Sequence, residues 1–162
     1  MSWARPRAFQ TIVIGGGIAG ILDGLDAVIY YHLSFGTHPV WLFQNIASGL
    51  LGKRSFSGGL GTMVLGVALH FTVAFGAASF YFFMSRGFPV LYRYPWIFGP
   101  AFGVGLYLFM QHVVIPLSLV HKRVIPAAWP ETLDQLFSHM VLVGLPIALM
   151  AKKSAGDDPH FA

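Results

Sequence analysis

Long apolar stretches separated by short polar segments dominate the hydrophobic pattern of this chain. Four of them approach the roughly 20 residues that a helix needs to cross a bilayer; they cover about residues 10–34, 59–84, 97–119 and 133–151. A helix satisfies its own backbone polar groups in lipid. The pattern therefore predicts an all-α integral membrane protein, a four-helix transmembrane bundle. Residues 1–153 are expected to form its single domain, and residues 154–162 a polar C-terminal tail.

A shorter apolar segment follows the first span. Its apolar residues fall largely on one helical face, with polar residues elsewhere: Val40, Trp41, Phe43, Ala47, Leu50 and Leu51, against Gln44, Asn45 and Ser48. This pattern predicts a short amphipathic helix that lies in the membrane interface or re-enters the bilayer. Pro39 is suited to the first turn of such a helix, because its missing N–H is not needed there.

The composition agrees with a membrane protein. Hydrophobic residues make up 56% of the 162 positions and charged residues only 10%, against about 25% charged residues in an ordinary soluble domain. So few charges cannot cover a surface that faces water. The chain contains no cysteine, which excludes disulfides, thiolate metal ligands and cysteine nucleophiles.

The basic residues predict the orientation of the chain. They flank the spans in pairs instead of clustering on one element, so the net charge of +4 does not indicate nucleic acid. Both ends of the chain and the second loop carry Arg5, Arg7, Arg86, Arg93, Lys152 and Lys153. The first and third loops carry Lys53, Arg54, Lys122 and Arg123. Because the first group is larger, the positive-inside rule predicts that both termini are cytoplasmic.

Small residues in the first span predict close helix packing. Gly16, Gly20 and Gly24 recur every four residues, and this spacing makes a shallow groove along one face of a helix. Another helix can approach such a groove closely. We therefore expect these glycines to form a packing face, within the bundle or toward a partner.

Five ionisable side chains are predicted to lie at similar depth in the membrane. Asp23 and His70 lie near the middle of the first and second spans. Asp26, His112 and His139 lie within about one turn of the middle of their spans, on the side of the first loop. An ionisable group at this depth costs at least ~2.5 kcal/mol unless it is paired or neutral, so we expect a compensating polar layer inside the bundle.

Three kinds of compensation remain open on the sequence alone. Mutual hydrogen bonds, including one from Tyr30, would only hold the bundle together. A proton or ion pathway would use the titration of histidine and of buried aspartate. A metal ion at His70, His112 and His139, or a b-type haem between two of the histidines, would make the layer a cofactor site. In each case, Asp23 or Asp26 is expected within hydrogen-bonding distance of one of these histidines, directly or through one water.

Short motifs in the later spans carry a family resemblance. A histidine stands in the middle of VALHFTVAF, of FMQHVVIPLSL and of LFSHMVLVGLPIALMAKK. Together with the glycine-rich start GGGIAGILDGLDAV, these segments resemble the bacterial YagU-like inner-membrane proteins over about residues 10–153. The resemblance implies a small polytopic protein of the bacterial inner membrane that is associated with growth under acid stress. It implies a shared role for His70, His112 and His139, whereas Asp23 and Asp26 are not carried over.

Together, these features predict a non-enzymatic protein of the lipid bilayer whose Asp/His layer handles protons or a metal ion. The alternative is a non-catalytic accessory subunit that packs against a larger respiratory, photosynthetic or transport complex. A four-helix bundle has little internal volume, so a homo-oligomer or a larger membrane complex is expected. No serine–histidine or carboxylate pair points to an obvious substrate cavity, so an enzyme is not expected.

Overall fold

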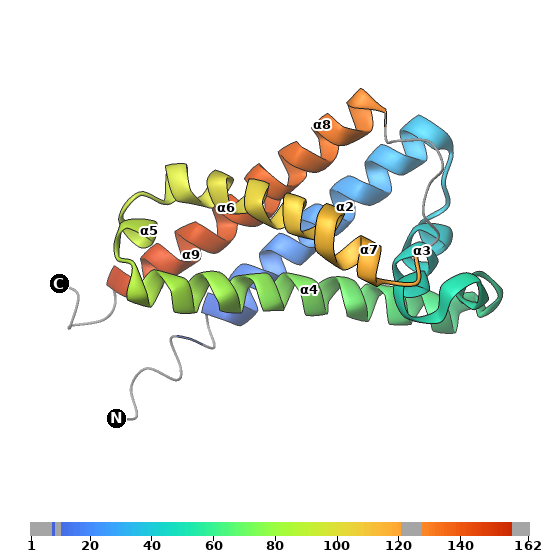
Figure 1. Cartoon of the computed structure of the whole chain (residues 1–162), viewed down its shortest axis with the longest axis horizontal. Helices are drawn as coiled ribbons and strands as arrows, with labels where there is room; N and C mark the ends of the chain where they lie inside the picture. Colours follow the sequence, from blue (N-terminus) through green and yellow to red (C-terminus); the bar gives the residue numbers. More distant parts are fainter. Residues whose placement is uncertain (1–7, 9–10, 121–127, 157–162) are drawn as a thin grey trace.

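Four long helical segments build the bundle in a computed structural model that describes residue 8 and residues 11–120 and 128–156 (Figure 1). Within these ranges the chain forms helices and no strand. The four segments are η1 (Thr11–Gly15) with α2 (Gly16–Phe35); α4 (Gly59–Gly87); α6 (Pro95–Phe109) with η3 (Met110–Val114) and α7 (Ile115–Leu117); and α8 (Trp129–Phe137) with η4 (Ser138–Gly144) and α9 (Leu145–Gly156). Each segment is long and apolar enough to cross a membrane. The predicted all-α four-helix bundle is confirmed.

Shorter helices cover the two ends of the bundle. The start of α2, the end of α9 and the short α5 (Val90–Arg93) lie at one end, whereas α3 (Pro39–Leu51) and η2 (Gly52–Ser57) lie at the other (Figure 1). Successive long segments therefore run in opposite directions. The amphipathic segment after the first span is helical, as predicted, and Pro39 lies in its first turn.

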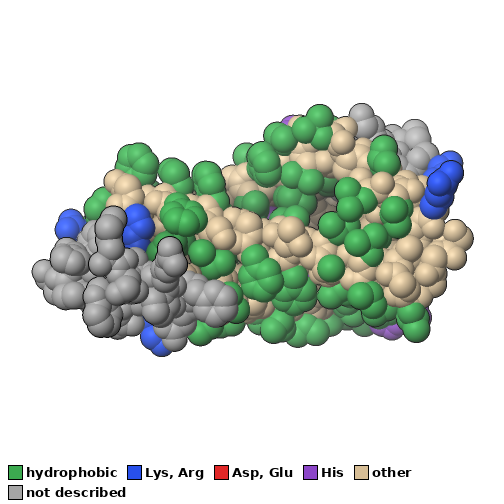
Figure 2. All heavy atoms as spheres, turned by 90° about the horizontal axis from the view of Figure 1, so that it is seen from below, with side chains coloured by type: hydrophobic (Ala, Val, Ile, Leu, Met, Phe, Trp, Pro, Cys, Tyr) green, Lys and Arg blue, Asp and Glu red, His purple; other side chains and the backbone are tan. Residues whose placement is uncertain are grey.

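The apolar surface places this bundle in a lipid bilayer. Figure 2 shows apolar side chains along the length of one face, with Lys and Arg near its two ends. Large apolar side chains such as Leu25, Phe83 and Leu117 are more than half exposed. Soluble monomers rarely expose continuous apolar patches of this kind, whereas lipid tails cover them without cost. The protein is therefore a small multi-pass membrane protein.

Small residues bring the helices close together. The buried core contains Ala19, Ala77, Ala78, Ala148 and Ala151, packed around larger side chains that include Tyr81 and Ile147. The Tyr81 hydroxyl donates a hydrogen bond of 3.0 Å to the Leu91 carbonyl and ties α4 to α5. Nη2 of Arg86 donates to the Ser154 hydroxyl over 2.9 Å and ties α4 to α9.

The glycine face of α2 packs against α4 of the same chain. A Cβ atom at Gly16 would lie 2.6 Å from the Phe75 ring, and one at Gly20 would lie 2.8 Å from the Phe71 ring. A Cβ atom at Gly24 would lie 3.2 Å from Nε2 of His70. Because α4 fills this groove, the three glycines bring two spans of one chain together and leave no groove there for a partner.

The fourth segment extends beyond its predicted bounds at both ends. Its helix begins at Trp129, with Pro130 and Glu131 in the first turn, which suits the N-terminus of a helix. The apolar pattern placed the start at residue 133 because Glu131 is charged. At the other end, α9 continues through Lys152 and Lys153 to Gly156, so the first residues of the predicted polar tail are helical. Residues 157–162 lie outside the described residues.

Candidate functional site

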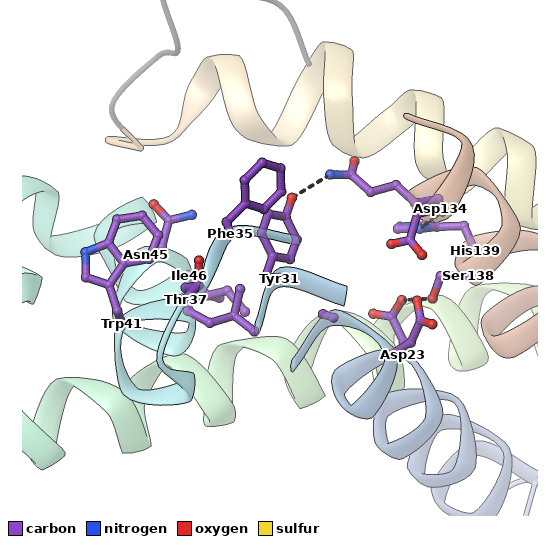
Figure 3. A pocket seen from close by; sticks show the side chains of 14 residues that line it. Asp23, Tyr31, Phe35, Thr37, Trp41, Asn45, Ile46, Asp134, Ser138 and His139 are labelled. Atoms are coloured by element: carbon purple, nitrogen blue, oxygen red, sulfur yellow. Dashed lines mark hydrogen bonds between the residues drawn. The ribbon is translucent and has the colours of Figure 1, made fainter. Parts of the chain in front are cut away.

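A polar cavity of about 430 Å³ lies between α2, α3 and the fourth segment (Figure 3). Its lining residues are Asp23, Asp26, Ala27, Tyr31 and Phe35 from α2; Thr37; Trp41, Leu42, Asn45 and Ile46 from α3; and Asp134, Gln135, Ser138 and His139 from α8 and η4. The cavity contains Asp23, Asp26 and His139 from the predicted polar layer. It adds Asp134, which was not among the residues predicted for this layer.

Carboxylates gather at one end of this cavity. Asp23 and Asp26 project from α2, and Asp134 approaches from α8. Each of them is close enough for electrostatic interaction with its neighbours. None of the described lining residues is a lysine or an arginine. Like charges in an apolar setting repel each other strongly, so this end of the cavity favours the entry of a positive charge.

Ser138 connects the two helices that supply the carboxylates. Its hydroxyl is buried and donates a hydrogen bond of 2.6 Å to Oδ1 of Asp23, and it also interacts with Asp26. The short distance is typical of a hydrogen bond to a charged acceptor. Ser138 therefore holds the Asp23 carboxyl in a fixed orientation, with Oδ2 left for another partner.

His70 of α4 lies on the other side of the Asp23 carboxyl. Its Nδ1 is 3.9 Å from Oδ2 of Asp23, and these side chains are only 13% and 22% exposed. This is an ion-pair distance, longer than a hydrogen bond. The Nε2 atom of His70 lies 2.8 Å from the Gly20 carbonyl. The predicted Asp–His neighbourhood is therefore present, but the direct hydrogen bond to Asp23 comes from Ser138 and not from a histidine.

The other two histidines of the predicted layer point to different places. Each donates from Nδ1 to the backbone carbonyl one turn earlier: His139 to Gln135 over 2.8 Å and His112 to Leu108 over 3.0 Å. His139 lines the cavity and packs edge-on against the Tyr107 ring, with ring centroids 5.7 Å apart. The His112 side chain is exposed on the outside of the bundle.

The three histidines do not converge on one point. Among the described residues, no group of three or more His, Asp or Glu side chains is arranged to hold a metal ion. The metal site predicted at His70, His112 and His139 is therefore not assembled by the described residues. Since His112 faces outward, a b-type haem between it and another histidine of the layer does not fit this arrangement either.

A second polar network lies beside the carboxylates. The Tyr31 hydroxyl donates to Oε1 of Glu131 over 2.5 Å and accepts from Nε2 of Gln135 over 3.0 Å. Gln111 in turn donates to Gln135 over 2.9 Å. Tyr30 was the tyrosine predicted to bond a carboxyl of the Asp/His layer, whereas the tyrosine of this neighbouring network is Tyr31. The ring of Tyr30 packs against Tyr31 and Phe35. The network ties the first, third and fourth segments together.

Two prolines explain the local backbone around the histidines. In η3 the N–H of Ile115 bonds to the Met110 carbonyl, and in η4 the N–H of Leu145 bonds to the Met140 carbonyl. Both donors directly precede a proline, Pro116 and Pro146. A proline ring crowds the carbonyl one turn before it and provides no N–H, and a widened π-helical turn relieves this crowding. In η4 this turn carries Ser138 and His139 into the cavity wall.

No protein-family model, curated protein or solved structure matches this chain. The cavity and the Asp23–His70 pair are the features of this molecule that bear on its function.

Proposed function

We propose that this multi-pass membrane protein has a non-enzymatic role in which the Asp23–His70 pair takes up and releases a proton. One observation carries the proposal: Nδ1 of His70 faces Oδ2 of Asp23 at 3.9 Å, while Nε2 of the same ring bonds to the Gly20 carbonyl. A carbonyl oxygen only accepts hydrogen bonds, so Nε2 must carry the hydrogen. In a neutral imidazole, the other nitrogen then has a lone pair.

This arrangement leaves room for one proton between the two side chains. Without it, the lone pair of Nδ1 faces an acceptor oxygen of Asp23, which is unfavourable in a partly buried site. A proton on either atom turns this contact into a hydrogen bond or an ion pair. Ser138 keeps Oδ1 occupied, so the proton is directed to Oδ2. The pair is thus suited to alternate between a protonated and a deprotonated state.

The cavity supports access to this pair from one side of the membrane. The cavity extends from α3 at one end of the bundle to Asp23, and its α3 end includes the polar side chains of Thr37 and Asn45 beside the aromatic ones. On the other side of Asp23, the bundle is filled by the apolar core around Ala19, Tyr81 and Ile147. Water and protons enter polar cavities more readily than apolar cores, so exchange is expected from the α3 side only.

Infrared difference spectroscopy on the purified protein in mild detergent tests the proposal. A pH step that changes the proton occupancy of the pair should change the carboxyl band of the wild type, with isotope-labelled aspartate identifying the group. Asp23→Asn keeps the acceptor for Ser138 and should remove part of this change. His112→Gln is the matched control, because that histidine makes the same backbone contact as His139 but faces outward, and it should leave the band unchanged. An unaltered band in Asp23→Asn would overturn the proposal.

We propose the bacterial inner membrane as the location, with both termini in the cytoplasm. The resemblance to YagU-like proteins and the distribution of Lys and Arg support this orientation, and an association with growth under acid stress would suit a proton site. Because the chain has no cysteine, single cysteines can be labelled without background. Ser57→Cys, at the exposed α3 end, should react with an impermeant maleimide from the periplasm, and protection there would reverse the orientation.

One observation favours the accessory-subunit alternative. In the most apolar part of the third membrane segment, Pro95–Leu117, only 11% of the residues are buried, against 22–28% in the other three. A helix this exposed is covered by lipid or by another protein. Purification in mild detergent separates the two: a stoichiometric partner would support an accessory subunit or a larger complex, a homo-oligomer would support self-association, and a lone particle would support the proton proposal alone.

A further inference from the structure

The cavity has two chemically different ends. Asp23, Asp134, Ser138 and His139 gather at one of them, and Phe35, Trp41 and Ile46 lie toward the other, with Tyr31 between (Figure 3). The proton site uses only the first end. A proton or a small inorganic ion leaves most of an aromatic and apolar wall without contact, so this second end suits a larger occupant with an apolar group of its own.

The aromatic end is held in place by its own contacts. The Trp41 ring stacks on Phe56, with centroids 5.3 Å apart and an interplanar angle of 28°. The ring of Phe35 packs against Tyr31, with centroids 5.7 Å apart. These contacts orient the two rings, which are at least half exposed, at this end of the cavity. Aromatic rings pack against apolar groups, and their faces attract organic cations.

Charge and size define the class of ligand. The carboxylates at the other end favour a cation, and the described lining residues provide no lysine or arginine to neutralise them. The volume of about 430 Å³ lies within the range of roughly 300–1,000 Å³ for small-molecule sites, far more than a single metal ion occupies. The described residues also offer no convergent group of metal ligands.

We infer that the cavity binds an organic ammonium ion with an apolar group. The ammonium lies among Asp23, Asp26 and Asp134, and the apolar group lies against Trp41, Phe35 and Ile46. This inference rests on the proposed function in one respect: the ammonium and the proton use the same Asp23 carboxyl, so they compete. The ionisable groups around the ammonium are Asp23, Asp26 and Tyr31 from α2, His70 from α4, and Glu131, Asp134 and His139 from the fourth segment.

Calorimetric titration of the full chain in mild detergent with phenylethylammonium tests this site. Phenylethanol, its neutral analogue, measures the apolar contribution, and potassium measures the contribution of charge alone. The ammonium should bind about tenfold or more tightly than either probe, and its affinity should fall as the pH is lowered and the carboxylates take up protons. Equal affinities for the ammonium and the alcohol would overturn the inference, because they would indicate partition into the micelle.

Variants at the two ends distinguish this site from the proton site. Trp41→Leu should weaken ammonium binding about tenfold while leaving the infrared change of Asp23 intact. Trp96→Leu is the matched control, since Trp96 is 68% exposed on α6 and does not line the cavity. Asp134→Asn nearly preserves the side-chain volume and removes the charge, so it should also weaken ammonium binding. An infrared change without ammonium binding would overturn this inference alone, and ammonium binding without the infrared change would overturn the proton proposal alone.

Discussion

Oγ of Ser138 donates a hydrogen bond of 2.6 Å to Oδ1 of Asp23, and this contact joins the fourth membrane segment to the first. The Ser138 hydroxyl is thus the direct hydrogen-bonding partner of the Asp23 carboxyl, which has apolar residues on both sides in the sequence. A carboxylate at this depth must be protonated or find a donor, and here the donor is a hydroxyl. The same bond fixes the orientation in which Oδ2 faces His70.

The first prediction concerns the energetic coupling of Ser138 and Asp23. Asp23→Ala and Ser138→Ala should each destabilise the bundle, because each leaves a buried polar group without this partner. The double variant should cost less than the sum, with a coupling of about 1 kcal/mol, as expected for interhelical hydrogen bonds in membranes. Reversible unfolding in mixed micelles of mild detergent and dodecyl sulfate measures all three free energies.

Ser79→Ala provides the control for this cycle. The Ser79 hydroxyl donates to the Phe75 carbonyl within α4 over 2.7 Å, so its removal deletes a hydroxyl of the same kind without touching Asp23. Its effect should add to that of Asp23→Ala. Additive effects of Ser138→Ala and Asp23→Ala would instead mean that the 2.6 Å bond contributes nothing to stability.

Tyr31 is predicted to hold the second polar network together. Tyr31→Phe removes the hydroxyl that donates to Glu131 and accepts from Gln135 while keeping the ring. We expect a loss of about 1–3 kcal/mol in the free energy of unfolding, because one of the lost bonds involves a buried carboxyl. Tyr30→Phe removes the neighbouring hydroxyl and should cost little. Equal effects of the two variants would contradict the role of this network.

The sequence predicted the depth of a side chain in the membrane better than the direction in which that side chain points. Counting residues along each span placed Asp23 and His70 at the same level, and the structure brings them within 3.9 Å. The same count placed His112 at a suitable level, yet its side chain is exposed. Depth follows from the rise of about 1.5 Å per residue, whereas direction also depends on helix rotation. A π-helical turn such as η3 changes that rotation, and the count assumed regular α-helix.

Asp134 and Glu131 were missed for a different reason. The predicted span began at residue 133, so Glu131 fell outside it, and Asp134 in its first residues was not counted in the polar layer near the middle of the span. The structure shows that Glu131, Asp134, Gln135 and Ser138 lie on one side of a continuous helix, and Glu131 is only 3% exposed. Their spacing of i, i+3, i+4 and i+7 is that of one helical face. This polar stripe was visible in the sequence and would have extended the predicted layer.

The last prediction tests how tightly the third and fourth segments are packed. A Cβ atom at Gly103 would collide with the carbonyl oxygen of His139 and would lie 2.6 Å from the Cα atom of Met140. These are backbone atoms, so a rotamer change cannot relieve the collision and the two helices must separate. Gly103→Ala should therefore destabilise the bundle by about 1–3 kcal/mol.

Gly105→Ala, two residues along α6, is the matched control, because its Cβ would meet no atom within 4 Å among the described residues. It should leave stability unchanged or raise it by up to about 1 kcal/mol. Unfolding in the same mixed micelles measures both variants, and equal stabilities would show that α6 and η4 do not approach as closely as this contact requires.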